Sequence, residues 1–223
     1  MNIYIVIPAY NEDQTLTQVL SELKKDYSNI IVVDDGSTDN TFQQALLAKV
    51  VVLSHLINRG QGAALATGIN YALEQGADII VTFDADGQHQ VAEIAKIIQP
   101  LIEQQVDVVL GSRFLGQQSK IPLFRKIILK MAIIFTWLIS GIKLTDAHNG
   151  FRAFNRLAAE KIKISQDRMA HSSEIIEEIK RNKLNYKEVP VTISYTKYSL
   201  SKGQTFWDSF KIAKDIFFKK IIK

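Results

Sequence analysis

Two carboxylates follow an apolar run in the string IIVTFDADGQH, residues 79–89. The run at 79–83 is too short for a long helix and is rich in Val and Ile, so it predicts a buried strand. Comparable runs lie at 3–7, 30–33, 50–54 and 106–110, and helix-like stretches separate them at 12–27, 40–48, 62–75 and 91–104. This alternation predicts an α/β fold in which helices cover both faces of a mostly parallel sheet.

The paired carboxylates are the strongest candidate site, because ligands of such sheets bind beyond the carboxyl ends of the strands. An extended Asp84-Ala85-Asp86 can direct both carboxylates toward one divalent cation, and Gln88 offers a third oxygen. Hard oxygen ligands of this kind suit Mg²⁺ or Mn²⁺. The alternative is an ordinary acidic turn, since Asp and Gly are common in turns.

Two further strings follow apolar runs in the same way. In VVDDGSTD, residues 32–39, Asp35 is the candidate ligand of a nucleoside base or ribose, while Asp39 is expected to cap the next helix. In VIPAYNE, residues 6–12, Pro8 stiffens the strand exit, Tyr10 offers a ring face for a base, and Glu12 offers an acceptor.

Composition and missing motifs exclude several other classes of protein. The 223 residues are 47% hydrophobic and 22% charged, which excludes a disordered chain or a fibre, and the absence of cysteine excludes disulfides and thiolate metal sites. The string NRGQGAA follows the third run, not the first, and lacks the last glycine of a dinucleotide fingerprint. No P-loop string, hydrolase elbow, histidine metal spacing or secretory signal is found.

The two halves of the chain carry opposite charge. Residues 1–112 hold 5 Lys or Arg against 14 Asp or Glu, whereas residues 113–223 hold 22 against 9. The first half suits a cation, and the second suits phosphates or an anionic membrane. A nucleic-acid partner is not expected, because the acidic half would repel phosphates and no motif interleaves aromatic and basic residues.

The second half contains two apolar or amphipathic segments. A helix is expected at 123–142, and one of its faces carries Phe124, Ile127, Ile128, Met131, Phe135, Leu138, Ile139 and Ile142. Its apolar run is too short to span a bilayer, so it is expected either to be a buried core helix or to dip into the membrane surface. Helices at 158–164 and 173–182 and a strand at 187–195 are expected to follow. A basic, aromatic stripe at 206–221 predicts an interfacial helix on anionic lipid, with docking on the domain or on a small membrane-protein partner as alternatives.

Seven strings in order resemble the family-2 glycosyltransferases of GT-A fold, in the dolichol-phosphate mannose synthase-like branch that transfers sugars to polyprenyl phosphates. They are VIPAYNE, VVDDGSTD, NRGQGAALATG, FDADGQH, GSRF, NGFRAF and EVPVTISYTKYSLSKGQ. The resemblance implies a GT-A domain at 1–198 and a basic amphipathic helix at 199–223. It implies that the nucleotide-diphospho-sugar, a UDP- or GDP-sugar, is bound by Pro8, Ala9, Tyr10, Glu12, Asp35, Asp84 and Ala85, and the metal by Asp84, Asp86 and Gln88.

The resemblance also implies an inverting displacement at the anomeric carbon of a hexose or N-acetylhexosamine. A polyprenyl phosphate acceptor, of undecaprenyl or dolichyl type, needs no general base, because a phosphate monoester is largely dianionic at neutral pH. The basic residues expected to bind the phosphates are Arg113, Arg125, Arg152 and Lys202, and those expected to act in catalysis are Asp86, Arg113 and Lys202. If the acceptor is instead a hydroxyl of a cell-surface glycan, Glu174 is the candidate base.

The sequence departs from this branch at three points. Asn149 replaces the usual serine before Gly-Phe-Arg. Near the C-terminus, YSLSKG replaces the familiar string with the phosphate-binding basic residue, which leaves Lys197 or Lys202 for that role, with Lys202 preferred. The C-terminal transmembrane helices of many bacterial relatives are missing. The protein is therefore expected in the cytoplasm, peripherally attached to the inner face of the cell membrane.

Overall fold

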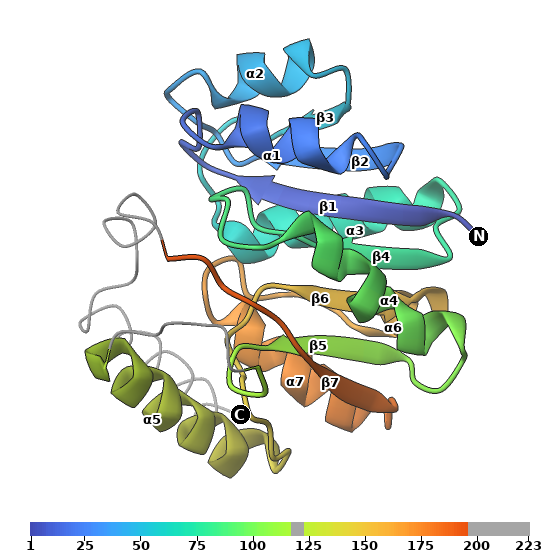
Figure 1. Cartoon of the computed structure of the whole chain (residues 1–223), viewed down its shortest axis with the longest axis vertical. Coiled ribbons are helices and arrows are strands. Elements are labelled where there is room, and N and C mark those ends of the chain that lie inside the picture. Colours follow the sequence, from blue (N-terminus) through green and yellow to red (C-terminus); the bar gives the residue numbers. More distant parts are fainter. Residues whose placement is uncertain (117–122, 196–223) are drawn as a thin grey trace.

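The computed structural model describes residues 1–116 and 123–195, and for several residues of one helix, Arg125 among them, it describes the backbone only. Seven strands form one sheet in the order β3-β2-β1-β4-β6-β5-β7 (Figure 1). They are β1 Ile3–Ala9, β2 Asn29–Asp34, β3 Val51–Ser54, β4 Ile79–Thr82, β5 Val108–Ser112, β6 Arg152–Asn155 and β7 Tyr186–Pro190. The expected mostly parallel α/β sheet is confirmed, and of these strands β6 alone is antiparallel to its neighbours.

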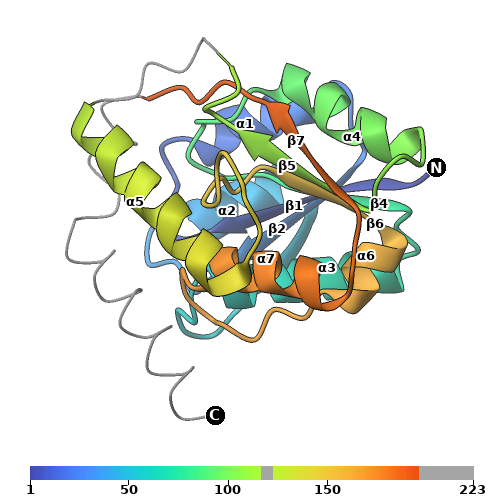
Figure 2. The same ribbon diagram turned by 90° about the horizontal axis from the view of Figure 1, so that it is seen from below.

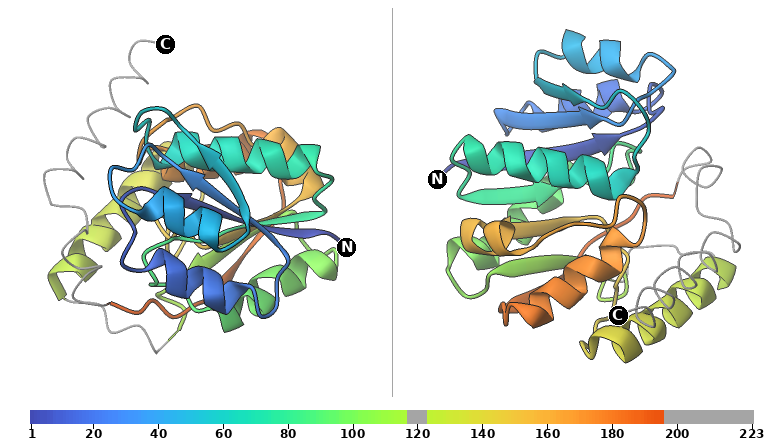
Figure 3. Two further views of the ribbon diagram at one scale, coloured as in Figure 1. Left: turned by 90° about the horizontal axis from the view of Figure 1, so that it is seen from above. Right: turned by 180° about the vertical axis from the view of Figure 1, so that it is seen from behind.

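Helices cover both faces of the sheet, as expected. The helices are α1 Leu16–Leu23, α2 Thr41–Leu47, α3 Gln61–Glu74, α4 Ile94–Ile102, α5 Leu123–Ser140, α6 Arg156–Lys161 and α7 His171–Arg181. Figures 2 and 3 show α1, α2 and α4 on one face, and α3, α6 and α7 on the other. The N-cap of α2 is Asn40, one residue after the expected Asp39, but the Asp39 carboxylate does accept a hydrogen bond from the first helical N–H, Thr41 N, at 2.9 Å.

The alternation of side chains along β1 divides the core into two parts. Ile5 and Ile7 pack toward α1 and α4, whereas Val6 packs toward α3 and α7. The close approach of α3 depends on Gly68, where an added Cβ would lie 2.4 Å from Val6 Cγ1. The sheet is therefore buried on both faces, which explains why its strands are continuous apolar runs.

The antiparallel strand β6 was not expected from the sequence. Its four residues begin with Arg152 and contain no run of β-branched side chains. An antiparallel strand begins where its parallel neighbours end, so the segment 146–150 reaches the carboxyl ends of β4 and β5. The strand predicted at 187–195 is also shorter, ending at Pro190.

The orientation of α5 decides between the two expectations for this helix. Met131 and Leu138, on the face with the regular apolar spacing, are 63% and 71% exposed. The opposite face turns inward, where Thr136 and Ser140 are buried and Ile133 packs against the core. The reading of α5 as a buried core helix is therefore wrong. No helix in residues 1–116 and 123–195 is long and apolar enough to cross a membrane.

Candidate active site

A cavity of about 630 Å³ opens at the carboxyl ends of β1, β2 and β4. This volume falls within the range of small-molecule sites, about 300–1,000 Å³. The site residues expected from the sequence that line it are Pro8, Ala9, Tyr10, Glu12, Asp35, Asp84, Ala85, Asp86, Gln88 and Arg113. The fold thus brings side chains from several strand ends together around one pocket.

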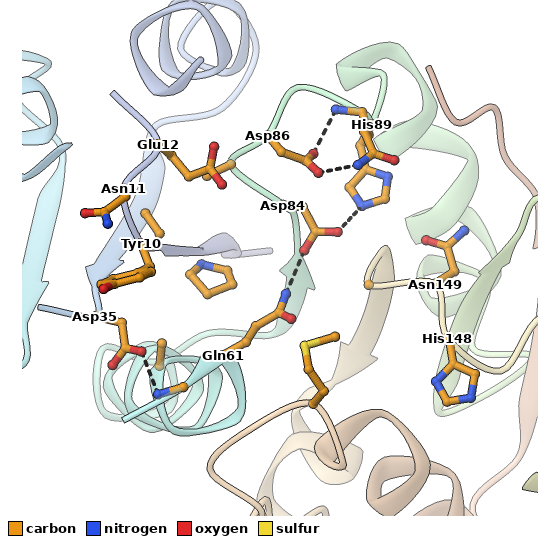
Figure 4. A pocket seen from close by; sticks show the side chains of 18 of the residues that line it. Tyr10, Asn11, Glu12, Asp35, Gln61, Asp84, Asp86, His89, His148 and Asn149 are labelled. Carbon is orange, nitrogen blue, oxygen red and sulfur yellow. Dashed lines mark hydrogen bonds and ion pairs between the residues drawn. The ribbon is translucent and has the colours of Figure 1, made fainter. Parts of the chain in front are cut away.

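Asp84 and Asp86 lie at the centre of this pocket, directly after β4 (Figure 4). Asp84 accepts hydrogen bonds from Gln61 Nε2 at 3.1 Å and is paired with His89 Nε2 at 2.9 Å. The Asp86 carboxylate accepts hydrogen bonds from the backbone N–H of Gln88, at 3.0 Å, and from Nε2 of the Gln88 side chain. Both carboxylates are therefore held in place by neutral or weakly basic donors.

The two carboxylates have pKa values shifted in opposite directions. Burial raises the pKa of Asp86, and the negative charge of Asp84 raises it further. Burial also acts to raise the pKa of Asp84, but His89, His171 and Arg113 together lower that pKa overall. Two half-buried carboxylates that repel each other are an arrangement that a bound cation would stabilise.

Gly150 allows the backbone to approach the Asp84 carboxylate closely. A Cβ added to Gly150 would lie 2.7 Å from Asp84 Oδ2, so any larger residue would displace the carboxylate. The segment before β6 thus forms one wall of the pocket beside Asp84. Figure 4 shows His148 and Asn149 on this side, and Tyr10 and Asp35 on the other.

The Asp35 carboxylate is held by three donors from the protein. Its carboxylate accepts hydrogen bonds from the backbone N–H groups of Arg59, at 3.0 Å, and Gly60, at 2.6 Å, and is paired with His55 Nδ1 at 2.7 Å. Only 2% of the residue is exposed, although it borders the pocket. Tyr10, by contrast, exposes its ring at the same end, as a base-stacking residue would.

Arg113 lies at the other end of the pocket and is buried in an ion pair. Its Nε donates to Asp146 Oδ2 at 2.5 Å, and its NH1 donates to Tyr195 Oη at 3.4 Å. Asp146 is itself held in a segment whose backbone N–H groups donate to Glu188 on β7, at 2.9 Å from Thr145 and 3.1 Å from Asp146. The guanidinium is therefore fixed in direction, with a positive charge facing the pocket.

The comparisons with known proteins identify the family. Residues 4–163 match the family described as Glycosyl transferase family 2. The chain belongs to this glycosyltransferase family. A 38% identical relative, UDP-N-acetylglucosamine--dolichyl-phosphate N-acetylglucosaminyltransferase of Methanococcus voltae, aligns over 94% of the chain and 92% of its own length. Undecaprenyl-phosphate mannosyltransferase of Micrococcus luteus is 32% identical over 69% of the chain and 66% of its own length.

Solved structures confirm the GT-A fold of this glycosyltransferase. Glucosyl-3-phosphoglycerate synthase from Mycobacterium tuberculosis, in complex with Mn²⁺ and UDP-glucose, matches with a TM-score of 0.72 over 97% of the chain and 76% of its own length. The sequence identity is 16%, so the likeness concerns the fold. The expected resemblance to the polyprenyl-phosphate sugar transferase branch is supported by the names of the two sequence relatives.

Of the expected phosphate-binding residues, Arg152 lies away from the pocket. The Arg152 guanidinium of the glycosyltransferase donates to the carbonyls of Asn149, at 2.9 Å, and Ala147, at 3.1 Å, and it is not among the residues that line the pocket. Its expected contact with a phosphate is therefore replaced by a structural role, bracing the segment before β6. The side chain of Arg125 and all of Lys202 lie outside the described part of the chain, as does the helix expected at 199–223.

Glu174, the candidate base for a hydroxyl acceptor, is also engaged in structural hydrogen bonds. Its carboxylate accepts from the backbone N–H groups of Ser165 and Gln166, both at 2.9 Å. These contacts secure the loop between α6 and α7, and Glu174 does not line the pocket. A base role for Glu174 is therefore not supported by its position.

Several residues of the pocket were missed by the sequence reasoning. His89, for which the sequence shows no metal-ligand spacing, is the partner of Asp84. Gln61, at the start of α3, is the second donor to the Asp84 carboxylate. Met169 lines the pocket from the loop before α7. For His148 and Asn149, the departure from the usual Ser-Gly-Phe-Arg string was the available signal.

His171 gives a prediction on acid stability. It is 3% exposed, and burial lowers its pKa to about 4. The unfolded chain takes up a proton near pH 6.5 while the folded state stays neutral, so the free energy of unfolding falls as pH drops from about 6.5 toward 4. We expect urea unfolding to show that His171 accounts for a loss of about 2 kcal/mol between pH 7.5 and pH 5. The His171→Asn variant should lose correspondingly less over this interval, and an undiminished loss would contradict the assignment.

Proposed function

We propose that the protein transfers a hexose or N-acetylhexosamine from a nucleotide-diphospho-sugar to a polyprenyl phosphate, with inversion at the anomeric carbon. The observation that carries the proposal is the pair Asp84 and Asp86 at the centre of a pocket that is lined by Tyr10 and Asp35 at one end and by Arg113 at the other. At the first end, Tyr10 presents its ring beside Asp35, and at the second Arg113 presents its charge.

The residues at the centre fit a divalent cation such as Mg²⁺ or Mn²⁺. Asp84 and Asp86 are half-buried and repel each other, and Gly150 lets the backbone approach the Asp84 carboxylate closely. Among the described residues, no three His, Cys, Asp or Glu side chains lie close enough together to hold a metal ion. In this proposal the third protein ligand is therefore the amide oxygen of Gln88. A bound cation would act as a Lewis acid on the donor diphosphate. His89 and Gln61 hold Asp84 in the orientation that this requires.

The acceptor is proposed from the relatives and from the chemistry of the cationic end. The Methanococcus voltae and Micrococcus luteus relatives are named for dolichyl phosphate and undecaprenyl phosphate. A phosphate monoester is a ready nucleophile at neutral pH, so the protein needs to position it and to offset its charge. Arg113 supplies positive charge in a fixed direction, and the structural engagement of Glu174 agrees with an acceptor that needs no base.

The exposed face of α5 supports contact with the membrane that holds such a lipid. Exposed apolar side chains recur along it at three- and four-residue spacing: Ile127, Met131, Ile134 and Leu138. Lys126 and Lys130 are exposed beside them, and Leu129 on the inner side lines the pocket. An apolar stripe flanked by lysines suits a surface of anionic lipid, and it adjoins the acceptor end of the site.

The proposed transfer is tested by the chemical nature of the product. Purified protein is incubated with undecaprenyl phosphate, Mg²⁺ or Mn²⁺, and radiolabelled UDP- and GDP-sugars, beginning with UDP-N-acetylglucosamine. We expect label that extracts into organic solvent and is released by mild acid. Label that stays in the aqueous phase on an added glycan would favour the alternative, a family-2 transferase that extends a cell-surface polysaccharide at a hydroxyl. No transfer from any donor would refute the proposal.

The contact of α5 with lipid gives a second, separate prediction. Leu138→Glu puts a charge into the apolar stripe and should lower co-sedimentation with phosphatidylglycerol vesicles at least about tenfold, since burying one leucine contributes about 2 kcal/mol. Leu47→Glu on α2 is the matched control, because Leu47 is 81% exposed on a helix remote from α5 (Figure 1). Equal vesicle binding by the two variants would show that α5 is not the lipid contact.

A further inference from the structure

The Asp35 carboxylate binds both ends of the segment between β3 and α3. Asp35 is paired with His55 Nδ1, at 2.7 Å, where the segment begins, and accepts from the backbone N–H of Gly60, at 2.6 Å, where it ends. The N–H of Arg59 contributes a third hydrogen bond at 3.0 Å. Between these points Asn58 lines the pocket, together with Gly60 itself. We call residues 55–60 the clamp loop.

The His55 ring is fixed through both of its nitrogens. An ionised carboxylate can only accept, so the proton on the side of Asp35 belongs to Nδ1. Nε2 lies 3.0 Å from Thr67 Oγ1 on the second turn of α3, and 10% of the His55 side chain is exposed. His55 therefore links the end of β2 to α3 through a nearly buried contact.

The clamp loop is also packed tightly against its neighbours. A Cβ on Gly36 would lie 2.7 Å from the carbonyl carbon of Ile57, so the turn after Asp35 rests directly on the loop backbone. Gly60 has φ +107, and a Cβ there would lie 2.4 Å from the carbonyl oxygen of Asp167. Because there is little space on either side, a small shift of either end would bring the loop backbone into contact with its neighbours. The hydrogen bonds at the two ends therefore determine the path of the loop.

The hydrogen bonds of Asp35 limit what it can offer a ligand. A carboxylate has about four acceptor positions, and three are used by His55, Arg59 and Gly60. A nucleotide that reaches Asp35 thus meets a group whose direction is already set by the protein. Of these three donors His55 alone is a side chain, and its contact with Thr67 anchors it to α3 beyond the clamp loop, so the direction of the carboxylate depends on His55.

We propose that His55 is a positioning residue for nucleotide binding: it donates to Asp35, which in turn holds the clamp loop as the wall of the nucleotide end of the pocket. The inference rests on the proposed nucleotide-sugar donor and adds a residue outside the pocket lining to the binding machinery. His55 acts through Asp35 and needs no contact with the substrate.

Two substitutions separate the hydrogen bond from the shape of the ring. His55→Phe keeps a planar ring without a donor, whereas His55→Asn keeps an N–H group near the position of Nδ1 and loses the contact with Thr67. Titration calorimetry of the full chain with UDP and with GDP, in Mn²⁺, measures the dissociation constants. We expect His55→Phe to weaken binding of the preferred nucleotide at least about tenfold, because the buried Asp35 carboxylate loses one of its three donors and is no longer linked to α3. His55→Asn should stay within about threefold of the unsubstituted protein.

Amide hydrogen exchange of Arg59 and Gly60 tests the clamp without any nucleotide. These amides should exchange faster in His55→Phe than in the unsubstituted protein, and His55→Asn should restore protection. If the unsubstituted protein binds neither nucleotide, the proposed donor is wrong, and exchange alone decides whether the clamp exists. Tight nucleotide binding by His55→Phe would overturn the inference. Equal weakening by both variants would do so as well, since the donor to Asp35 would then not be what matters.

Discussion

Asp86→Asn should reduce sugar transfer at least about a thousandfold, because several kcal/mol of charge stabilisation at the departing diphosphate depend on the cation. The amide oxygen of asparagine can still accept from the Gln88 N–H, so the turn after β4 is retained. The variant should also lose the difference in nucleoside diphosphate affinity between Mn²⁺ and chelator, which titration calorimetry measures without turnover.

Folding of Asp86→Asn gives an independent check on this result. The raised pKa of Asp86 means that its ionised form disfavours the folded state, so a neutral side chain should leave the free energy of unfolding equal or higher without metal. Asp26→Asn is the matched control, since it removes one negative charge from an exposed position. Normal turnover by Asp86→Asn, or an equal loss in Asp26→Asn, would remove Asp86 from the proposed metal site.

Arg113→Met should lower the free energy of unfolding by about 3–5 kcal/mol, because it leaves the Asp146 carboxylate buried without its cation. The two side chains are 7% and 1% exposed. Burial acts to lower the pKa of Arg113, but Asp146 and Tyr195 together raise that pKa overall, and Asp146 contributes the larger share. Urea unfolding with an unchanged denaturant slope measures the loss.

Arg59→Met is the matched control for Arg113→Met, because it removes an arginine from an exposed ion pair, the one with Asp167. Arg59 and Asp167 lie 3.7 Å apart with 52% and 57% of their side chains exposed, so the loss there should be within about 1 kcal/mol. Similar losses in the two variants would mean that the buried pair does not stabilise this end of the pocket. If Arg113 also binds the acceptor, a milder Arg113→Lys change should raise the KM for polyprenyl phosphate more than it lowers kcat.

The local features of the site could be predicted from the sequence because they depend on neighbouring residues. A run such as 79–83 must be buried on both faces, and the Asp-x-Asp that follows it must leave the strand end. The partners of these carboxylates depend instead on distant segments: Gln61 reaches Asp84 across 23 positions, and Asp146 reaches Arg113 across 33. Such contacts have no signature in the spacing of residues.

The errors have equally specific causes. In α5 both faces are apolar, so periodicity alone does not indicate which face packs inward, and the regularly spaced face with Met131 and Leu138 is the exposed one. Arg152 and Glu174 carry charges suited to a substrate, but each is used to satisfy main-chain groups of a loop. Main-chain partners leave no trace in the sequence, because every residue has the same backbone groups.

The reversed strand β6 ties the two sides of the pocket together. The parallel strands β1, β2 and β4 lead into one side, and the segment entering β6 forms the wall beside Asp84. The two sides meet at Gly150, which lies against the Asp84 carboxylate and whose carbonyl accepts a hydrogen bond from Thr82 Oγ1 at 2.6 Å. A side chain introduced at this one glycine would therefore disturb both sides of the pocket at once.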